Sequence, residues 1–165
     1  PAPTPSTSTA RSLATLAQQI SQALAAHGLG AVATVTLSAS SVVVQVLADK
    51  AFFDTDSADL GAKGAALVDA VSGVLRDTPN PIAVDGYTDN QPILGGPYTS
   101  NWELSAARAA TVVNRMATVD GVDDARLSAI GYGETHPLVP NSSPANQAMN
   151  RRIDFVVLSP ESTAP

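Results

Sequence analysis

The sequence has no cysteine, few charged residues and no long apolar run. Without cysteine, the redox compartment cannot be inferred from disulfide bonds. Lys and Arg number 9 against 15 Asp and Glu, and the net charge of -6 excludes a non-specific nucleic-acid binder, which needs a basic face. An anionic membrane surface is disfavoured for the same reason. No stretch approaches the roughly 18–20 apolar residues of a membrane span, and no signal-peptide pattern is present, so we expect a soluble chain.

The composition predicts one folded domain with a tether at each end. A length of 165 residues suits a single core, and the 44% hydrophobic content is that of a globular protein. Residues 1–10 hold prolines and hydroxyl residues with nothing to pack, which is typical of a linker. Residues 160–165 have a similar composition and are expected to be disordered. Between the tethers we expect an N-terminal helix within residues 11–30 and the main domain over residues 31–159.

Apolar spacing and turn residues predict an α/β sandwich of the α+β type, in which helices pack on one face of a mixed sheet. The predicted helices cover residues 11–27, 60–77 and 101–117. The predicted strands cover residues 32–37, 42–48, 81–86, 127–132 and 153–158. Residues 141–150 are expected to form a loop with at most one short helix. The apolar stripe of the first helix either lies on the domain or meets a second copy of the chain.

The third predicted helix has two organised faces. Ser100 and Glu103 fit a capping box at its start. One face carries an apolar stripe that includes Trp102, which we therefore expect to be buried in the core. The other face is polar and carries Asn101, Ser105 and Arg108 at helical spacing.

This polar face points to a binding site. Asp89 follows a predicted strand, and Arg108 lies two turns into the helix that packs back beside it, so the two charges can flank one cleft. A carboxylate and a guanidinium aimed at a gap suit a zwitterion such as an amino acid, with Asn101 and Thr88 supplying neutral hydrogen bonds. The spacing alone leaves a structural reading open, in which Asp89 is a turn former or an ion-pair partner of Arg108.

Five segments of the chain, in order, resemble the OmpA/MotB family of peptidoglycan-binding domains over about residues 50–158. The segments are Phe53–Leu60, Gly86–Ile93, Ser100–Ala109, Arg126–Glu134 and Asn150–Phe155. Within the family, the Asn-Gln-Pro-Ile extension and the Ser-Asn-Trp-Glu-Leu-Ser helix start are most similar to the MotB-like branch of flagellar stator proteins. Tyr87 stands where that branch usually has His, and Tyr also occurs there in the broader family.

The resemblance implies that the ligand is the peptide stem of peptidoglycan. Its diaminopimelate would be held by Asp89 and Arg108, and Asn101 matches the asparagine with which the family starts this helix. The resemblance also places Phe53, Thr88 and Leu104 on segments that line the groove. The Arg151–Arg152 pair leaves two alternatives open. Either one of the two arginines contacts the ligand or braces the site, and we then select Arg152, or both are structural. Tyr132 and Glu134 are expected to order the loop.

The resemblance further implies a non-catalytic, periplasmic wall anchor on a single-pass inner-membrane protein. The implied partners are peptidoglycan, a second copy in a homodimer, a MotA-like membrane subunit and the flagellar basal-body ring, with no nucleic acid, cofactor or metal. The alternatives are a wall-anchoring domain of an outer-membrane protein or lipoprotein, and a module for dimerisation or docking only.

Enzymatic readings have less support in the sequence. Asp85 and Asp89 would have to act as an acid/base pair, yet one lies inside a predicted strand and the other beyond its end. His27 and His136 are too isolated for a zinc site. The glycine pair at Gly131 and Gly133 follows no phosphate-loop pattern.

Overall fold

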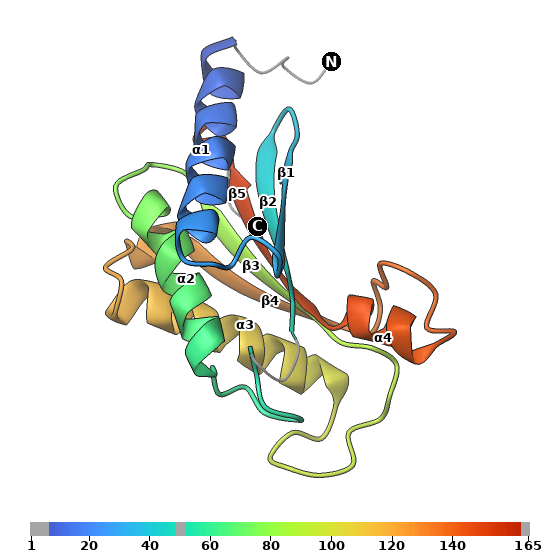
Figure 1. Cartoon of the computed structure of the whole chain (residues 1–165). Coiled ribbons are helices and arrows are strands. Elements are labelled where there is room, and N and C mark those ends of the chain that lie inside the picture. The colour runs from blue at the N-terminus through green and yellow to red at the C-terminus, as the bar shows by residue number, and fades with distance from the viewer. Residues whose placement is uncertain (1–6, 49–51, 163–165) are drawn as a thin grey trace.

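A computed structural model describes residues 7–48 and 52–162 and has one mixed sheet (Figure 1). The helices are α1 (Thr7–Ala26), α2 (Ala62–Leu75), α3 (Asn101–Thr118) and α4 (Pro144–Asn150), with a short 3-10 helix at Asp124–Arg126. The strands are β1 (Ala33–Leu37), β2 (Ser41–Leu47), β3 (Ile82–Tyr87), β4 (Leu127–Gly133) and β5 (Arg152–Leu158). Their order is β1-β2-β5-β3-β4, in which β3 and β4 are parallel and the other neighbours are antiparallel.

The core lies between the sheet and the three long helices. α1 and α3 contact the sheet, and α2 lies against both of them (Figure 1). Alternate residues of β2 and β5 point into this layer, as the period of a strand requires. On β2 and β5, the residues that point into this layer are Val42, Val44, Val46, Ile153, Phe155 and Val157. The α+β fold with a mixed sheet under helices is therefore confirmed.

The apolar stripe of α1 packs on the domain itself. Leu13, Ile20 and Leu24 are each at most 1% exposed and belong to the main core. Of the two expectations for this helix, the intramolecular one describes the structure. α1 begins at Thr7, inside the segment expected to be a linker, while residues 1–6 and 163–165 of the expected tethers lie outside the described residues.

Two glycines let α3 rest directly on the sheet. A Cβ on Gly86 of β3 would lie 2.3 Å from the carbonyl oxygen of Ser105, and a Cβ on Gly131 of β4 would lie 2.4 Å from the backbone nitrogen of Ala106. The Ser105 hydroxyl also accepts a hydrogen bond of 2.9 Å from the backbone N–H of Gly133. This close approach fixes the first turns of α3 beside the end of β3.

The predicted core position of Trp102 is wrong. Trp102 is 55% exposed, and Ala106, one turn further along the same stripe, is exposed as well. The buried residues of α3 are instead Leu104, Ser105, Arg108, Ala109, Val112 and Met116. Trp102 lies in the first turn, where its ring passes Gly133 at the last residue of β4, at 3.4 Å from a Cβ built there. The sheet ends at that point, so no further strand is available to cover the indole ring.

The start of α3 is capped much as expected. The Ser100 hydroxyl accepts from the backbone N–H of Glu103 at 3.1 Å. The Glu103 carboxylate reaches back to the backbone N–H of Thr99 at 2.7 Å, one residue earlier than the usual capping box would have it. The short helix allowed for residues 141–150 is present as α4, with Ser143 as its N-cap.

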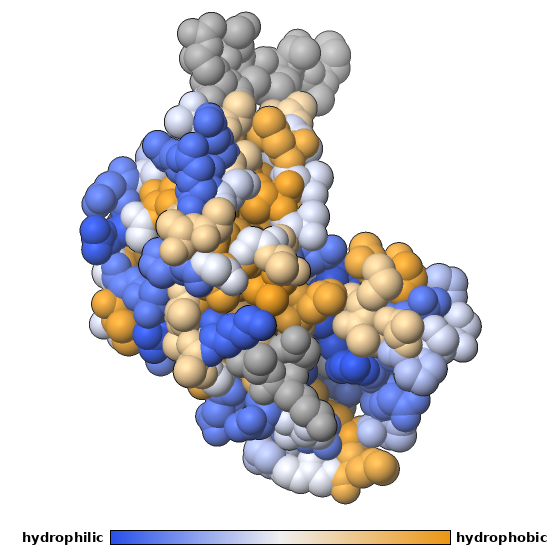
Figure 2. All heavy atoms as spheres, viewed as in Figure 1, coloured by the Kyte–Doolittle hydropathy of each residue, from blue (hydrophilic) through white to orange (hydrophobic). Residues whose placement is uncertain are grey.

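The hairpin of β1 and β2 forms one edge of the sheet and has no charged residue between positions 31 and 48. Apolar side chains gather over this hairpin in the upper part of the surface view (Figure 2). Edge strands of soluble proteins usually carry charges that prevent strand pairing between molecules. The β1 edge lacks that protection.

Candidate functional site

A pocket of about 340 Å³ lies where β3 ends and α3 begins. Six of the seven predicted site residues line it. They are Phe53, Thr88, Asp89, Asn101, Leu104 and Arg108. Residues outside the predicted set of seven complete the wall. They are Ala48, Asp54, Thr55, Asp56, Gln91, Pro92, Ile93 and Arg151.

The end of β3 is held in place by hydrogen bonds from its own loop and from α3. The backbone N–H of Thr88 donates to the carbonyl of Gly133 at 2.9 Å, and the Thr88 hydroxyl donates to the carbonyl of Asp89 at 2.8 Å. The Asn101 side-chain amide donates to the carbonyl of Gln91 at 3.0 Å and to the Glu134 carboxylate at 3.2 Å. Thr88 and Asn101 thus shape the loop that presents Asp89, and Glu134 orders it as expected.

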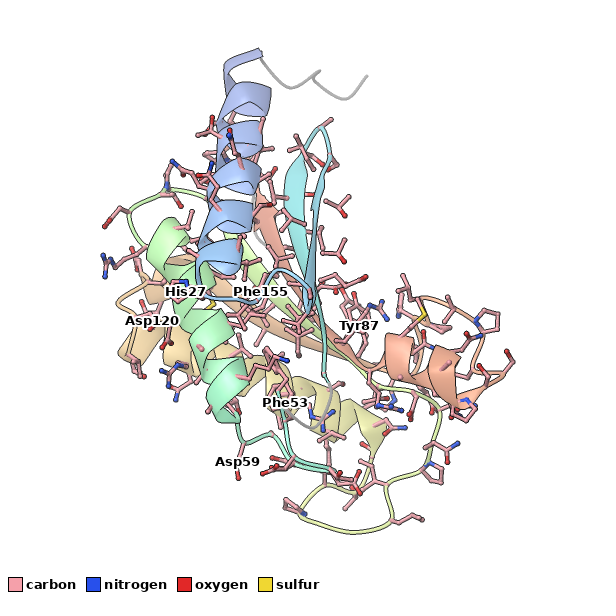
Figure 3. All side chains as sticks on the ribbon, viewed as in Figure 1. His27, Phe53, Asp59, Tyr87, Asp120 and Phe155 are labelled. Carbon is pink, nitrogen blue, oxygen red and sulfur yellow. The ribbon has the colours of Figure 1, made fainter. Side chains whose placement is uncertain are left out.

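Arg108 enters the pocket from α3 with a buried guanidinium. Its Nε donates to the carbonyl of Ser57 at 2.8 Å, its Nη2 donates to the carbonyl of Asp54 at 3.3 Å, and its Cζ lies 5.0 Å from the centre of the Phe53 ring. Figure 3 labels Phe53 in the segment that leads to α2, where it overlaps α3 in this view. Nη1 of Arg108 has no hydrogen-bond partner among residues 7–48 and 52–162. Burial lowers the pKa of Arg108 to about 10, so the group stays charged at neutral pH.

Asp89 is buried at the same pocket and is held by two other groups. One carboxylate oxygen accepts from the backbone N–H of Gln91 at 2.9 Å, so Asp89 does form the turn that its position suggested. The other oxygen forms an ion pair with Nη1 of Arg151. The ion pairs of the described residues include none between Asp89 and Arg108. The two charges therefore line one pocket without neutralising each other.

Arg152, the seventh predicted site residue, does not line the pocket. It is 5% exposed and lies 3.7 Å from the centre of the Tyr87 ring, and its Nε is 3.4 Å from a carboxylate oxygen of Asp154. Tyr87 stands at the end of β3 nearest α4 (Figure 3). Neighbouring residues of an extended chain point in opposite directions, so Arg151 faces the pocket and Arg152 the sheet. The Asn-Arg-Arg signature marked both residues but not which one faces the site.

A second polar cluster lies on the sheet face opposite the helices. Asp85 on β3 and Asp154 on β5 are register partners, and each is 8% exposed. Each has a buried carboxylate oxygen without a hydrogen-bond partner among the described residues. Burial, and then the charge of Asp154, raise the pKa of Asp85 from 3.8 to about 6. Asp85 does not line the pocket, so it does not share a cleft with Asp89 as an acid/base pair would need.

This buried carboxyl predicts that stability depends on pH. The folded-state pKa of Asp85 is raised, so the folded protein binds the proton more tightly, and stability falls as pH rises from 3.8 through about 6. The difference corresponds to at most about 3 kcal/mol. We expect Asp85→Asn to be more stable than wild type by about 1–3 kcal/mol at pH 7.5 and to lose this advantage at pH 4. Urea unfolding at both pH values measures the stability difference between Asp85→Asn and wild type. A stability difference that is the same at both pH values would contradict the prediction.

The described residues contain no group of three or more His, Cys, Asp or Glu side chains placed to hold a metal ion. None of the helices in residues 7–48 and 52–162 is both long and apolar enough to span a membrane.

The architecture and the pocket define the class of this molecule. It is an α+β domain in which a mixed sheet under three helices presents a charged pocket at the junction of β3 and α3. Residues 52–151 match the model of the OmpA family, and the chain belongs to that family.

Relatives of known name and solved structures agree with this assignment. The chain is 34% identical over 122 residues to the uncharacterised YtxE of Bacillus subtilis, covering 74% of this chain and 50% of that protein. It is 31% identical over 124 residues to Motility protein B of the same organism, covering 74% and 48%. The chain thus spans about half the length of these relatives.

Among solved structures, a protein described as MotB-like from Desulfovibrio vulgaris superposes with a TM-score of 0.84 at 25% identity, covering 92% of this chain and 97% of that one. The cell wall anchor of the T6SS from Pseudomonas aeruginosa superposes with a TM-score of 0.77 at 30% identity, covering 85% and 96%. The shared fold therefore extends over most of this chain.

Proposed function

We propose that this domain anchors a larger protein to the cell wall by binding the peptide stem of peptidoglycan, without catalysing a reaction. The observation that carries the proposal is that Asp89 and Arg108 line one pocket and do not pair with each other. The similarity to Motility protein B and to the cell wall anchor of Pseudomonas aeruginosa supports it.

The pocket chemistry suits the zwitterionic end of diaminopimelate. The ligand carboxylate would accept from Nη1 of Arg108, whose Nε and Nη2 each already donate to a backbone carbonyl. The ligand ammonium would bind the Asp89 carboxylate. Phe53 and Leu104 line the same pocket and offer apolar surface to the methylene groups between the two ends. Charge-assisted hydrogen bonds of this kind contribute about 1.5–3 kcal/mol each.

For the larger assembly, we propose a periplasmic domain of a stator subunit that works as a homodimer beside a MotA-like membrane subunit. The identity to Motility protein B supports the stator, and the uncharged β1 edge supports self-association. A wall anchor outside the flagellar motor is the second candidate. It is favoured by the 30% identity to the T6SS cell wall anchor, which matches the 31% identity to Motility protein B.

Co-sedimentation with purified sacculi tests the function. We expect the wild-type domain to pellet with sacculi, to be released by free meso-diaminopimelate, and to stay in solution with chitin, which lacks the peptide stem. Incubation should release no soluble muropeptides. Protein that remains in the supernatant with sacculi, or a pellet that diaminopimelate does not compete, would overturn the proposed ligand.

A further inference from the structure

The Asp89 carboxylate already holds a cation from its own chain. Nη1 of Arg151 forms an ion pair with the carboxylate oxygen that does not accept from the backbone N–H of Gln91. Arg151 is the C-cap of α4, immediately before β5, and its side chain is 39% exposed while that of Asp89 is 9% exposed. The guanidinium therefore covers the carboxylate from the solvent side, and an incoming ammonium must take the same oxygen or share it.

Displacing Arg151 has an electrostatic cost that depends on the ligand. Arg108 lines the same pocket, and the charge of Arg151 is one of the causes that lower the pKa of Arg108, so the two guanidinium groups repel. An ammonium that takes Asp89 leaves Arg151 without its carboxylate, near Arg108. A ligand that also brings a carboxylate offsets this positive charge, whereas a simple amine does not.

We propose that Arg151 is a specificity-determining residue that competes for Asp89 and makes the pocket select zwitterionic ligands over simple amines. The inference rests on the proposed function, since it assumes that the ligand ammonium binds Asp89. Arg151 acts as an internal substitute for that ammonium, and only a ligand with both charges displaces it at low cost. Asp54 and Asp56 also line the pocket, and without Arg151 they would leave it open to amines.

A pair of matched probes tests the selectivity. Cadaverine has the two ammonium groups of diaminopimelate without its carboxylates, so the ratio of their affinities reports the discrimination. In wild type we expect cadaverine to bind at least about tenfold more weakly than meso-diaminopimelate, as measured by calorimetry. In Arg151→Gln we expect cadaverine to gain about tenfold while diaminopimelate gains less or loses affinity, so that the ratio falls. Arg151→Lys, which keeps the charge, should retain most of the discrimination.

Removing any positive charge near the pocket attracts amines, so the site of competition needs its own control. If Arg151 competes at Asp89, the cadaverine gain disappears in the double variant Asp89→Asn/Arg151→Gln. If the gain is a general field effect, it persists there. Arg76→Gln removes an exposed arginine that does not line the pocket and should change neither affinity.

A cadaverine affinity that is the same in Arg151→Gln and wild type, or a gain that survives in the double variant, would overturn the inference. Because Arg151 is partly exposed, its variants should fold, and their thermal unfolding midpoints check this. The outcomes separate the two proposals. Wild type that ignores both sacculi and diaminopimelate removes the proposed function, whereas normal binding with unchanged selectivity in Arg151→Gln removes only the role of Arg151.

Discussion

Asp89→Asn is expected to release the domain from sacculi and to weaken binding of meso-diaminopimelate by about 10- to 150-fold. The substitution keeps the side-chain oxygen that accepts from the backbone N–H of Gln91, so the turn is preserved. It removes the negative charge that the ligand ammonium needs, and the loss of a charge-assisted hydrogen bond corresponds to about 1.5–3 kcal/mol. Calorimetry with diaminopimelate and co-sedimentation with sacculi measure the two effects.

The same chemical change outside the pocket provides the control. Asp77→Asn alters a side chain that is 85% exposed and does not line the pocket, so it should bind like wild type. Arg108→Lys tests the other side of the pocket. It keeps the positive charge but removes the guanidinium N–H groups that donate to the carbonyls of Ser57 and Asp54. Retention of Asp89→Asn on sacculi at the wild-type level would show that the pocket is not the wall-binding site.

The parts of this structure that depend on local sequence could be predicted. The Val-rich runs became strands, and the Ser100 cap and the apolar period of the following segment fixed α3. The convergence of Asp89 and Arg108 on one pocket also followed, because a helix after a strand packs back beside it. Each of these inferences needs only neighbouring residues or one connection.

The errors occurred where a distant segment decides the environment. Trp102 has the right period for the core, but its ring lies beside Gly133 of β4, the edge strand, where no further strand covers it. Arg151 and Arg152 are adjacent and alike, and the end of α4 decides which of them reaches Asp89. The raised pKa of Asp85 depends first on its burial and then on the charge of Asp154, its partner on a strand that is far away in the sequence.

Gly131→Ala is expected to have the largest effect on stability. The new Cβ would lie 2.4 Å from the backbone nitrogen and 2.6 Å from the Cα of Ala106, and backbone atoms cannot turn aside as a flexible side chain can. α3 would have to move away from β4, which we expect to destabilise the fold by about 1–3 kcal/mol or more. Urea unfolding measures the loss.

Gly73→Ala is the matched control, because Gly73 lies inside α2 and a Cβ there would meet nothing within 4 Å. Alanine is the better helix former, so we expect this variant to gain about 0.5–1 kcal/mol. Since α3 also presents Arg108 and Asn101, the folded fraction of Gly131→Ala should bind diaminopimelate more weakly than wild type. Equal stability of Gly131→Ala and wild type would mean that α3 can move away from the sheet at no cost, and the position of Arg108 relative to Asp89 would then not be set by this contact.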